Sequence, residues 1–175
     1  PVWATAVELD MPITFHLGAR TSRFKDKTNF LCDLPMGKPA MLEMVNILLY
    51  SGVFDRHPKL RIGLIESGVG WILWACEYMD RAWEMQRHWT EVPNKMPPSF
   101  YFDQNVYASF IEDPVGVELR HKSGCKNIMW SSDYPHSETT FPHSHKAIAR
   151  NFAGVPQAER DWILAGCAEK FFGLK

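Results

Sequence analysis

Residues 60–71, with the sequence LRIGLIESGVGW, decide how this chain folds. The apolar run 60–65 suits a buried β-strand, and the glycines after it mark a turn. Apolar residues then recur at helical spacing over residues 71–89, so a long helix follows the strand directly. A strand that leads straight into a helix indicates a βαβ unit and therefore a parallel sheet.

The same alternation extends in both directions along the chain. We expect strands at 11–17, 100–102 with 106–110, and 127–130, and loops at 18–39 and 131–142. We expect helices at 2–9, 40–50, 71–89, from Asp113 to 121–122, 143–152 and 157–172, with stops at Gly52, Gly124, Gly154 and Gly173. On the helix 71–89, one face carries Trp71, Ala75, Tyr78, Ala82 and Trp89, with Glu77 and Arg81 on the outside. The chain is therefore predicted to be one α/β unit.

Composition excludes several classes of protein. The chain has 175 residues, 46% of them hydrophobic, which suits one domain with a core and excludes disorder. Its 19 basic and 20 acidic residues show no excess that would indicate a nucleic-acid partner. No apolar run approaches the roughly 18 residues of a membrane span, so we expect no membrane partner. The four scattered cysteines, Cys32, Cys76, Cys125 and Cys167, are expected to be reduced and mostly buried in a cytoplasmic protein.

The first residues suggest a longer protein. Pro1 is not a start methionine, and residues 2–9 have helical character with no capping residue before them. We therefore expect the chain to be the remainder of something longer. A removed tag or an omitted disordered start is the alternative explanation.

Chemistry is expected where the strands end. His16, Glu66 and Asp133 each follow a different predicted strand, and in parallel α/β folds these ends meet at one mouth. Imidazole and carboxylate groups suit Zn²⁺, Mn²⁺ or Fe²⁺. Each residue alone has a structural explanation as well, namely a hydrogen-bonded histidine, a helix cap and a turn-forming aspartate.

Four motifs carry a resemblance to a known family. They are ITFHLG at 13–18, GVFDRHPKL at 52–60, ESGVGW at 66–71 and WSSDYPH at 130–136. Their order and spacing resemble the amidohydrolase-2 family, whose members are metal-dependent hydrolases and decarboxylases with a (β/α)₈ TIM barrel. The resemblance implies that residues 1–175 form the C-terminal half of one such barrel domain, with strands five to eight.

The resemblance also implies roles for four residues. His16 matches a metal ligand, and Asp133 matches an aspartate that contacts the metal or its water and accepts a proton. Glu66 stands where many members have a catalytic histidine, so it would act as a base or orient the substrate. His136 would contact the substrate. The cofactor implied is a divalent metal, zinc first, with manganese or iron as alternatives.

One part of the family pattern is absent from this chain. The first strand of the family barrel carries a His-x-His or Glu-x-His pair, whereas the H-x-H here, His143 to His145, follows the last strand and suits a solvated face. Catalytic zinc usually has three protein ligands, and a half-barrel exposes two unpaired sheet edges. We therefore expect a missing N-terminal barrel half to complete the structure. Completion by a second copy of the chain, or aggregation through the exposed edges, are the alternatives.

Three functions remain in competition. The first is a metal-dependent hydrolase or decarboxylase that acts on a small cyclic or aromatic carboxylate, amide or lactone through a metal-activated water. The second is a non-catalytic pseudo-enzyme or assembly module, which Glu66 and the absent ligand pair favour. The third is a flavodoxin-like binder with an open sheet, although Gly18 begins no phosphate-binding motif.

Overall fold

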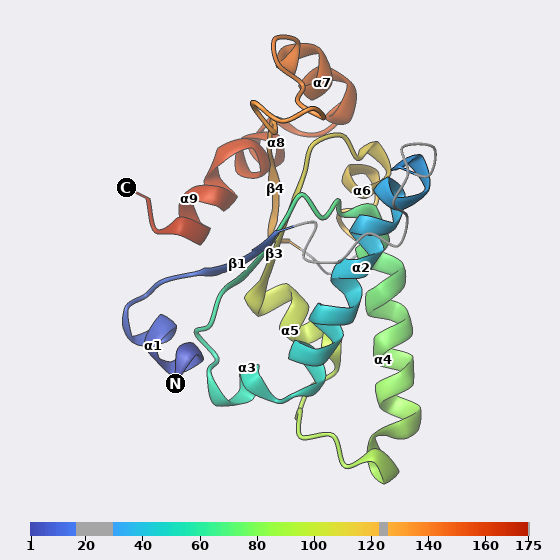
Figure 1. Cartoon of the computed structure of the whole chain (residues 1–175), viewed down its shortest axis with the longest axis vertical. Coiled ribbons are helices and arrows are strands. Elements are labelled where there is room, and N and C mark those ends of the chain that lie inside the picture. Colours follow the sequence, from blue (N-terminus) through green and yellow to red (C-terminus); the bar gives the residue numbers. More distant parts are fainter. Residues whose placement is uncertain (17–29, 123–125, 175) are drawn as a thin grey trace.

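The computed structural model describes residues 1–16, 30–122 and 126–174, and four short strands form its centre (Figure 1). The strands are β1 (Ile13–His16), β2 (Ile62–Ile65), β3 (Val106–Phe110) and β4 (Ile128–Trp130). The helices are α1 (Val2–Glu8), α2 (Phe30–Tyr50), α3 (Val53–Arg56), α4 (Gly70–Thr90), α5 (Pro98–Asn105), α6 (Pro114–Glu118), α7 (Ser144–Asn151), α8 (Gln157–Asp161) and α9 (Cys167–Phe172), with a π-helical turn, Trp162–Gly166, between the last two.

The strands pair in their order along the chain. All three pairings are parallel, and Thr14, Gly63 and Tyr107 lie side by side across β1, β2 and β3. Sequential order without a reversal is the pattern of a barrel wall, whereas a doubly wound sheet changes direction at a switch point. The flavodoxin-like alternative is therefore wrong.

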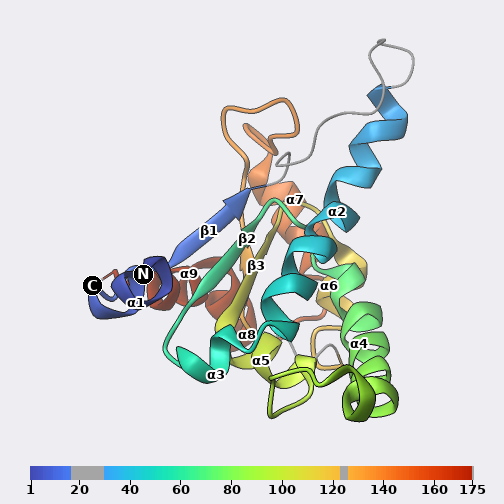
Figure 2. The ribbon, with the colours of Figure 1, turned by 60° about the horizontal axis from the view of Figure 1, so that its bottom comes forward.

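The two faces of the sheet are covered by different helices. Side chains such as Leu64 and Ala108 belong to the large core cluster with residues of α2 and α4. On the opposite face, Tyr107 and Met129 pack against Cys167 and Phe171 of α9. Figures 1 and 2 show α9 and α4 on opposite sides of the strands. We call the face that α9 covers the inner face.

The inner face requires a glycine at position 63. A Cβ atom built there would lie 2.6 Å from Cζ of Phe171 and 3.2 Å from Cγ2 of Thr14. The Phe171 ring also contacts the Tyr107 ring, with centroids 4.7 Å apart. Glycine thus lets the aromatic ring of α9 lie directly on the backbone of β2.

The predicted loop 18–39 is wrong over the part that the structure describes. Residues 18–29 lie outside the described residues, and α2 begins at Phe30 with Pro35 and Pro39 inside it. Each proline removes one helical hydrogen bond, which is why the sequence suggested a loop. The helix continues because its later residues, such as Val45 and Leu49, are buried in the core and anchor it.

The predicted strand at 100–102 is also wrong, because these residues belong to α5. Pro98 occupies the first turn of this helix, and the carboxylate of Asp80 accepts hydrogen bonds from the N–H and hydroxyl of Ser99, at 2.8 and 2.5 Å. Tyr101 and Phe102 are buried by packing of the helix, so their β propensity is overridden.

The predicted helix after Asp113 is shorter than expected. Asp113 caps α6 as predicted, since its Oδ1 accepts a hydrogen bond from the N–H of Gly116 at 2.9 Å, but the helix ends at Glu118 and not at 121–122. The predicted stops at Gly52, Gly154 and Gly173 have positive φ, as helix ends favour. Gly124 lies outside the described residues.

Helix α4 buries a different face from the one that the sequence predicts. Its buried residues are Ile72, Ala75, Cys76 and Met79, whereas Tyr78 and Trp89 are exposed. Within the described parts of the chain, no helix combines the length and apolar character needed to cross a bilayer.

Two of the four cysteines confirm the expectation of buried, reduced thiols. Cys76 and Cys167 are free and buried, and burial raises the pKa of each thiol to about 12. The side chains of Cys32 and Cys125 lie outside the described part of the structure.

Candidate active site

Three sequence-predicted residues lie at one edge of the sheet. His16 is the last residue of β1, Glu66 follows β2 directly, and Asp133 lies shortly after β4. Because the strands are parallel, these positions share the carboxyl edge, where ligands bind in such folds.

The side chains converge at this edge. Nε2 of His16 lies 3.0 Å from Oε1 of Glu66, and a carboxylate oxygen of Glu66 lies within 4.8 Å of one of Asp133. Oδ2 of Asp133 in turn lies 2.9 Å from Nδ1 of His136. The structure therefore brings all four candidate residues together.

The two carboxyl groups are shielded from solvent and the two imidazoles are not. The side chains of Glu66 and Asp133 are 11% and 7% exposed, whereas those of His16 and His136 are 60% and 62% exposed. Burial raises the pKa of Glu66, the neighbouring Asp133 raises it further, and His16 opposes both effects. Such a buried carboxyl pair beside open imidazoles is typical of sites that hold protons or cations.

The backbone at both acidic residues is unusual. Glu66 has φ of 59° and Asp133 has φ of 57°, in the left-handed region that residues other than glycine rarely adopt. At the second position, the N–H of His136 donates to the Asp133 carbonyl at 2.8 Å and closes a tight turn. Backbone strain of this kind clusters at functional sites, where the surrounding structure maintains it.

Two residues that sequence reasoning missed hold the loop after β2. Ser109 Oγ accepts a hydrogen bond from the N–H of Glu66 at 2.9 Å. Oδ2 of Asp113 accepts from the N–H groups of Val69 and Gly70, each at 2.7 Å. The sequence showed Asp113 only as the cap of its own helix, because nothing local indicates a partner loop 44 residues away.

Three donor groups lie close enough together to be candidates for a divalent cation. One ligand atom from each of Glu66, Asp133 and His136 lies within 4.8 Å of the others. Two ligands of one ion, each about 2 Å from it, are at most about 4 Å apart, so small side-chain shifts would bring these atoms around an ion. Within the described chain this group does not include His16, which reaches it through Glu66. The His143 and His145 side chains are exposed and lie outside the group.

Comparison with known proteins settles the family. The model of the family described as "Amidohydrolase" matches residues 1–174. The chain belongs to the amidohydrolase family. Two curated relatives are the decarboxylase orsB of Emericella nidulans, 31% identical over 150 residues, and the gamma-resorcylate decarboxylase of Rhodococcus jostii, 26% identical over 180 residues.

The matched regions cover most of this chain but only part of each relative. They span 77% and 91% of this chain against 44% and 49% of the two relatives, so the chain spans about half the length of the curated proteins it matches. A solved dihydroxybenzoic acid decarboxylase from Polaromonas, with bound manganese and 2-nitroresorcinol, is 21% identical with a TM-score of 0.74. That match covers 99% of this chain and 53% of the other. The predicted α/β fold, part of a TIM barrel, is confirmed.

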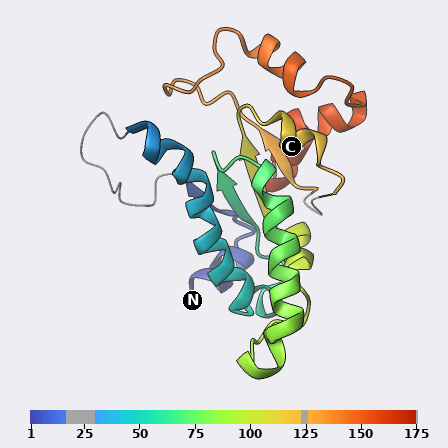
Figure 3. The same cartoon turned by 90° about the vertical axis from the view of Figure 1, so that its right-hand side faces the viewer.

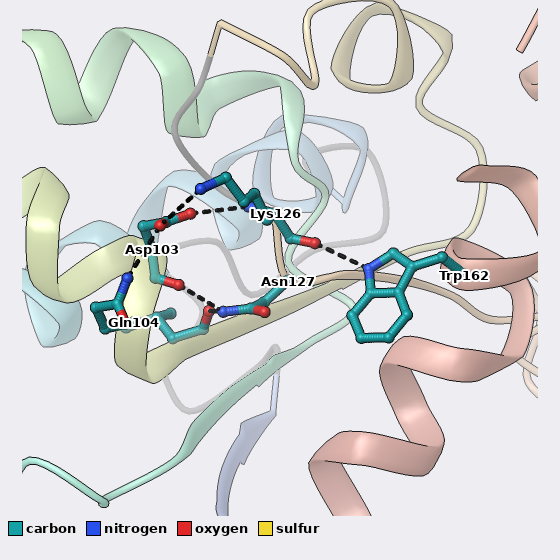
Figure 4. Close-up of polar contacts among 6 residues, drawn as sticks. Asp103, Gln104, Lys126, Asn127 and Trp162 are labelled. Atoms are coloured by element: carbon teal, nitrogen blue, oxygen red, sulfur yellow. Dashed lines mark hydrogen bonds and ion pairs between the residues drawn. The ribbon is translucent and has the colours of Figure 1, made fainter. Parts of the chain in front are cut away.

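A second polar cluster in this amidohydrolase lies at the opposite end of the strands (Figure 4). Asp103 contacts Nζ of Lys126 at 3.3 Å and accepts, through its carbonyl, from the side-chain amide of Asn127 at 2.8 Å. Trp162 Nε1 donates to the carbonyl of Lys126 at 3.2 Å, and Trp162 lines two cavities of about 260 and 410 Å³. These contacts join the start of β4 to its neighbours, and residues at this end of a barrel usually stabilise it.

Proposed function

We propose that the protein is a metal-dependent decarboxylase of small hydroxylated aromatic carboxylates, with its site at His16, Glu66, Asp133 and His136. The observation that carries this proposal is the convergence of these four side chains at the carboxyl edge of the sheet. The decarboxylases among the curated relatives support decarboxylation over hydrolysis.

The activity is proposed for a completed barrel. In the described sheet β1 and β4 are the edge strands, and closure of a barrel would pair them with further strands. We propose that these strands come from a missing N-terminal half, as the half-length match to the relatives suggests. The same strands would supply the remaining metal ligands.

His16 and Asp133 are proposed to hold the divalent cation, as the family resemblance implies, and Glu66 and His136, whose donor atoms cluster with that of Asp133, lie beside them. Imidazole nitrogen and carboxylate oxygen are suitable donors for manganese and for zinc. The manganese bound by the Polaromonas enzyme makes manganese the first ion to test, and zinc stays a prediction. When bound, the cation would polarise the carboxylate or phenolic oxygens of the substrate.

Glu66 is proposed to deliver the proton that the reaction consumes. Decarboxylation breaks the bond between the ring and the carboxylate carbon, leaves the electron pair on the ring carbon and releases carbon dioxide. That ring carbon then takes a proton. Glu66 lies between His16 and Asp133, so it can exchange a proton with the exposed imidazole and present it at the mouth of the site.

His136 is proposed to orient Asp133 and to line the substrate site. Its Nδ1 contacts Oδ2 of Asp133, while the ring is largely exposed at the mouth. An imidazole that holds a carboxylate in one orientation reduces the reorganisation that the reaction would otherwise require.

The test uses the full-length native protein loaded separately with Mn²⁺ and Zn²⁺. Hydroxylated benzoates are supplied as one panel, and cyclic amides and lactones as a second, with product and carbon dioxide both measured. We expect metal-dependent release of carbon dioxide from the first panel only. Turnover of the second panel alone would favour hydrolysis, and no turnover with no retained metal would favour a non-catalytic module.

A further inference from the structure

A cavity of about 260 Å³ lies near the start of β4, at the end of the strand opposite Asp133. Two of its lining residues, Ile128 and Ile163, are each 3% exposed and belong to the core cluster that includes Leu64. Figure 3 shows the C-terminal segments (red) beside β4 (orange) and away from α2 (blue). The cavity therefore has a buried apolar floor, which the described chain forms by itself.

Trp162 forms one wall of this cavity and is fixed in orientation. Its Nε1 donates to the carbonyl of Lys126 at 3.2 Å (Figure 4). The six-membered part of the indole lies against Gly166, where an added Cβ atom would be 3.0 Å from Cε3. Trp162 and Gly166 begin and end the π-helical turn, and such turns are frequent at functional sites. A flat aromatic wall that is held in one orientation favours an aromatic ligand.

A shared ion pair connects the two sides of the cavity. Oε2 of Glu159, on α8, lies 2.6 Å from Nε of Arg120 and 3.0 Å from Nε2 of His121. Arg120 and His121 follow the end of α6, so these contacts hold α6 and α8 on either side of the cavity. The negative charge of Glu159 is matched by Arg120.

Lys126 adds a positive charge that this ion pair does not neutralise. Its side chain is 82% exposed, and its Nζ contacts Asp103 at 3.3 Å. Exposed ion pairs contribute little to stability, so the ammonium group can turn toward a ligand at small cost. Among the described lining residues, Arg120 and Lys126 are positive and Glu159 is negative, which leaves one net positive charge with His121 neutral. The rim of the cavity therefore favours an anionic group over a neutral one.

We propose that this cavity binds a small aromatic carboxylate, with the ring beside Trp162 and the carboxylate at Lys126. An apolar cavity of about 150 Å³ holds a benzene ring, so about 260 Å³ has room for a molecule the size of benzoate. The buried floor would remove the ring from water, whereas the exposed rim would leave the carboxylate partly hydrated. This site is separate from the one at Asp133, because Lys126 precedes β4 and Asp133 follows it.

The first test titrates 4-fluorobenzoate into the full-length protein and follows the fluorine signal by NMR. The protein carries Asp133→Asn and is freed of metal, so that a metal-bound ligand does not contribute. We expect one equivalent to bind with a Kd of about 0.1–1 mM, and the neutral 4-fluorobenzamide to bind at least about threefold more weakly. Absence of binding up to about 10 mM, or equal affinity for the amide, overturns the proposal.

Variants made in the same protein locate the ligand. Lys126→Gln should weaken binding at least about threefold, because a charge-assisted contact to the carboxylate is lost. Lys122→Gln is the matched control and should change the Kd less than about 1.5-fold, since Lys122 is exposed and is not among the described lining residues. Equal effects of the two lysine variants overturn the proposal.

Trp162→Leu removes the aromatic wall and should weaken binding about three- to tenfold. Urea denaturation shows whether this variant is folded, and if it is not, the two lysine variants decide. A folded Trp162→Leu protein with the affinity of its parent overturns the placement of the ring.

Discussion

His16 and Glu66, which are fifty residues apart in the sequence, meet with Nε2 3.0 Å from Oε1. This contact joins the end of β1 to the end of β2 across the mouth of the sheet. An exposed imidazole is thereby linked to a buried carboxyl group, which is the element that the proposed proton delivery requires.

Glu66→Gln should separate proton delivery from metal binding. The amide preserves the shape of the side chain and can still hydrogen-bond His16, but it cannot deliver a proton. We expect turnover to fall about 10²- to 10⁴-fold while the metal content is unchanged. Steady-state kinetics and elemental analysis of the same sample measure both. Wild-type turnover would remove Glu66 from the reaction, and loss of metal would make it a ligand.

Asp133→Asn and His16→Ala should each release the metal. Both changes remove a proposed ligand atom, and loss of even a supporting group costs about 10- to 100-fold in metal affinity. Elemental analysis after dialysis should show less than about a tenth of the wild-type metal content. His145→Ala, an exposed histidine on α7, is the control and should keep both metal and turnover. Full metal retention in Asp133→Asn would reject the assigned site.

Gly63→Ala should destabilise the fold through α9. The added methyl group would lie 2.6 Å from Cζ of Phe171, so the ring must move. We expect the free energy of unfolding to fall by about 1–3 kcal/mol, measured by urea denaturation. Phe171→Leu in the same chain should recover part of that loss, because the shorter side chain leaves room. Strictly additive effects would show that the two residues are not in contact.

Asp113→Ala should cost more than an ordinary helix cap. One carboxylate accepts from Val69 and Gly70 as well as from Gly116, so its removal leaves three N–H groups without their acceptor. At about 1 kcal/mol per cap, we expect a loss of about 2–3 kcal/mol by thermal or urea denaturation. Glu118→Ala, an exposed change on the same helix, should alter stability by less than about 0.5 kcal/mol. Equal effects would contradict the shared role of Asp113.

Cys76 and Cys167 should resist alkylation in the folded protein. With a pKa of about 12, each thiol is ionised to about one part in ten thousand at pH 8, and the thiolate is the reactive form. Peptide mass spectrometry after iodoacetamide treatment should find both unmodified until denaturant is added. Rapid labelling of either cysteine under native conditions would show that the region around it opens.

The strands and their ends could be predicted because short apolar runs and turn residues are local signals. All four strands lie where expected, apart from residues 100–102, and the parallel order brings His16, Glu66 and Asp133 to one edge as inferred. Asp113 also caps its helix as its position before a proline indicated.

The errors arise where tertiary packing overrides local preference. The first ten residues of α2 are helical despite two prolines, and the aromatic residues of α5 are helical despite their β propensity. The hydrogen bond from the N–H of Glu66 to Oγ of Ser109 joins positions 43 residues apart, and a single sequence contains no signal for such pairs. The predicted core face of α4 is wrong for the same reason, since periodicity does not show which apolar face of a helix packs against the core.

The aromatic packing of α9 covers the inner face of the sheet near the amino ends of β2 and β3. Phe171 and Cys167 pack over Gly63 and Tyr107, so small molecules could not enter the site from that side of the sheet. In the proposed reaction the incoming acid and both departing products would then share a single entrance. Aromatic product that dissociates slowly would then block the entry of substrate. We therefore expect the product to be a competitive inhibitor.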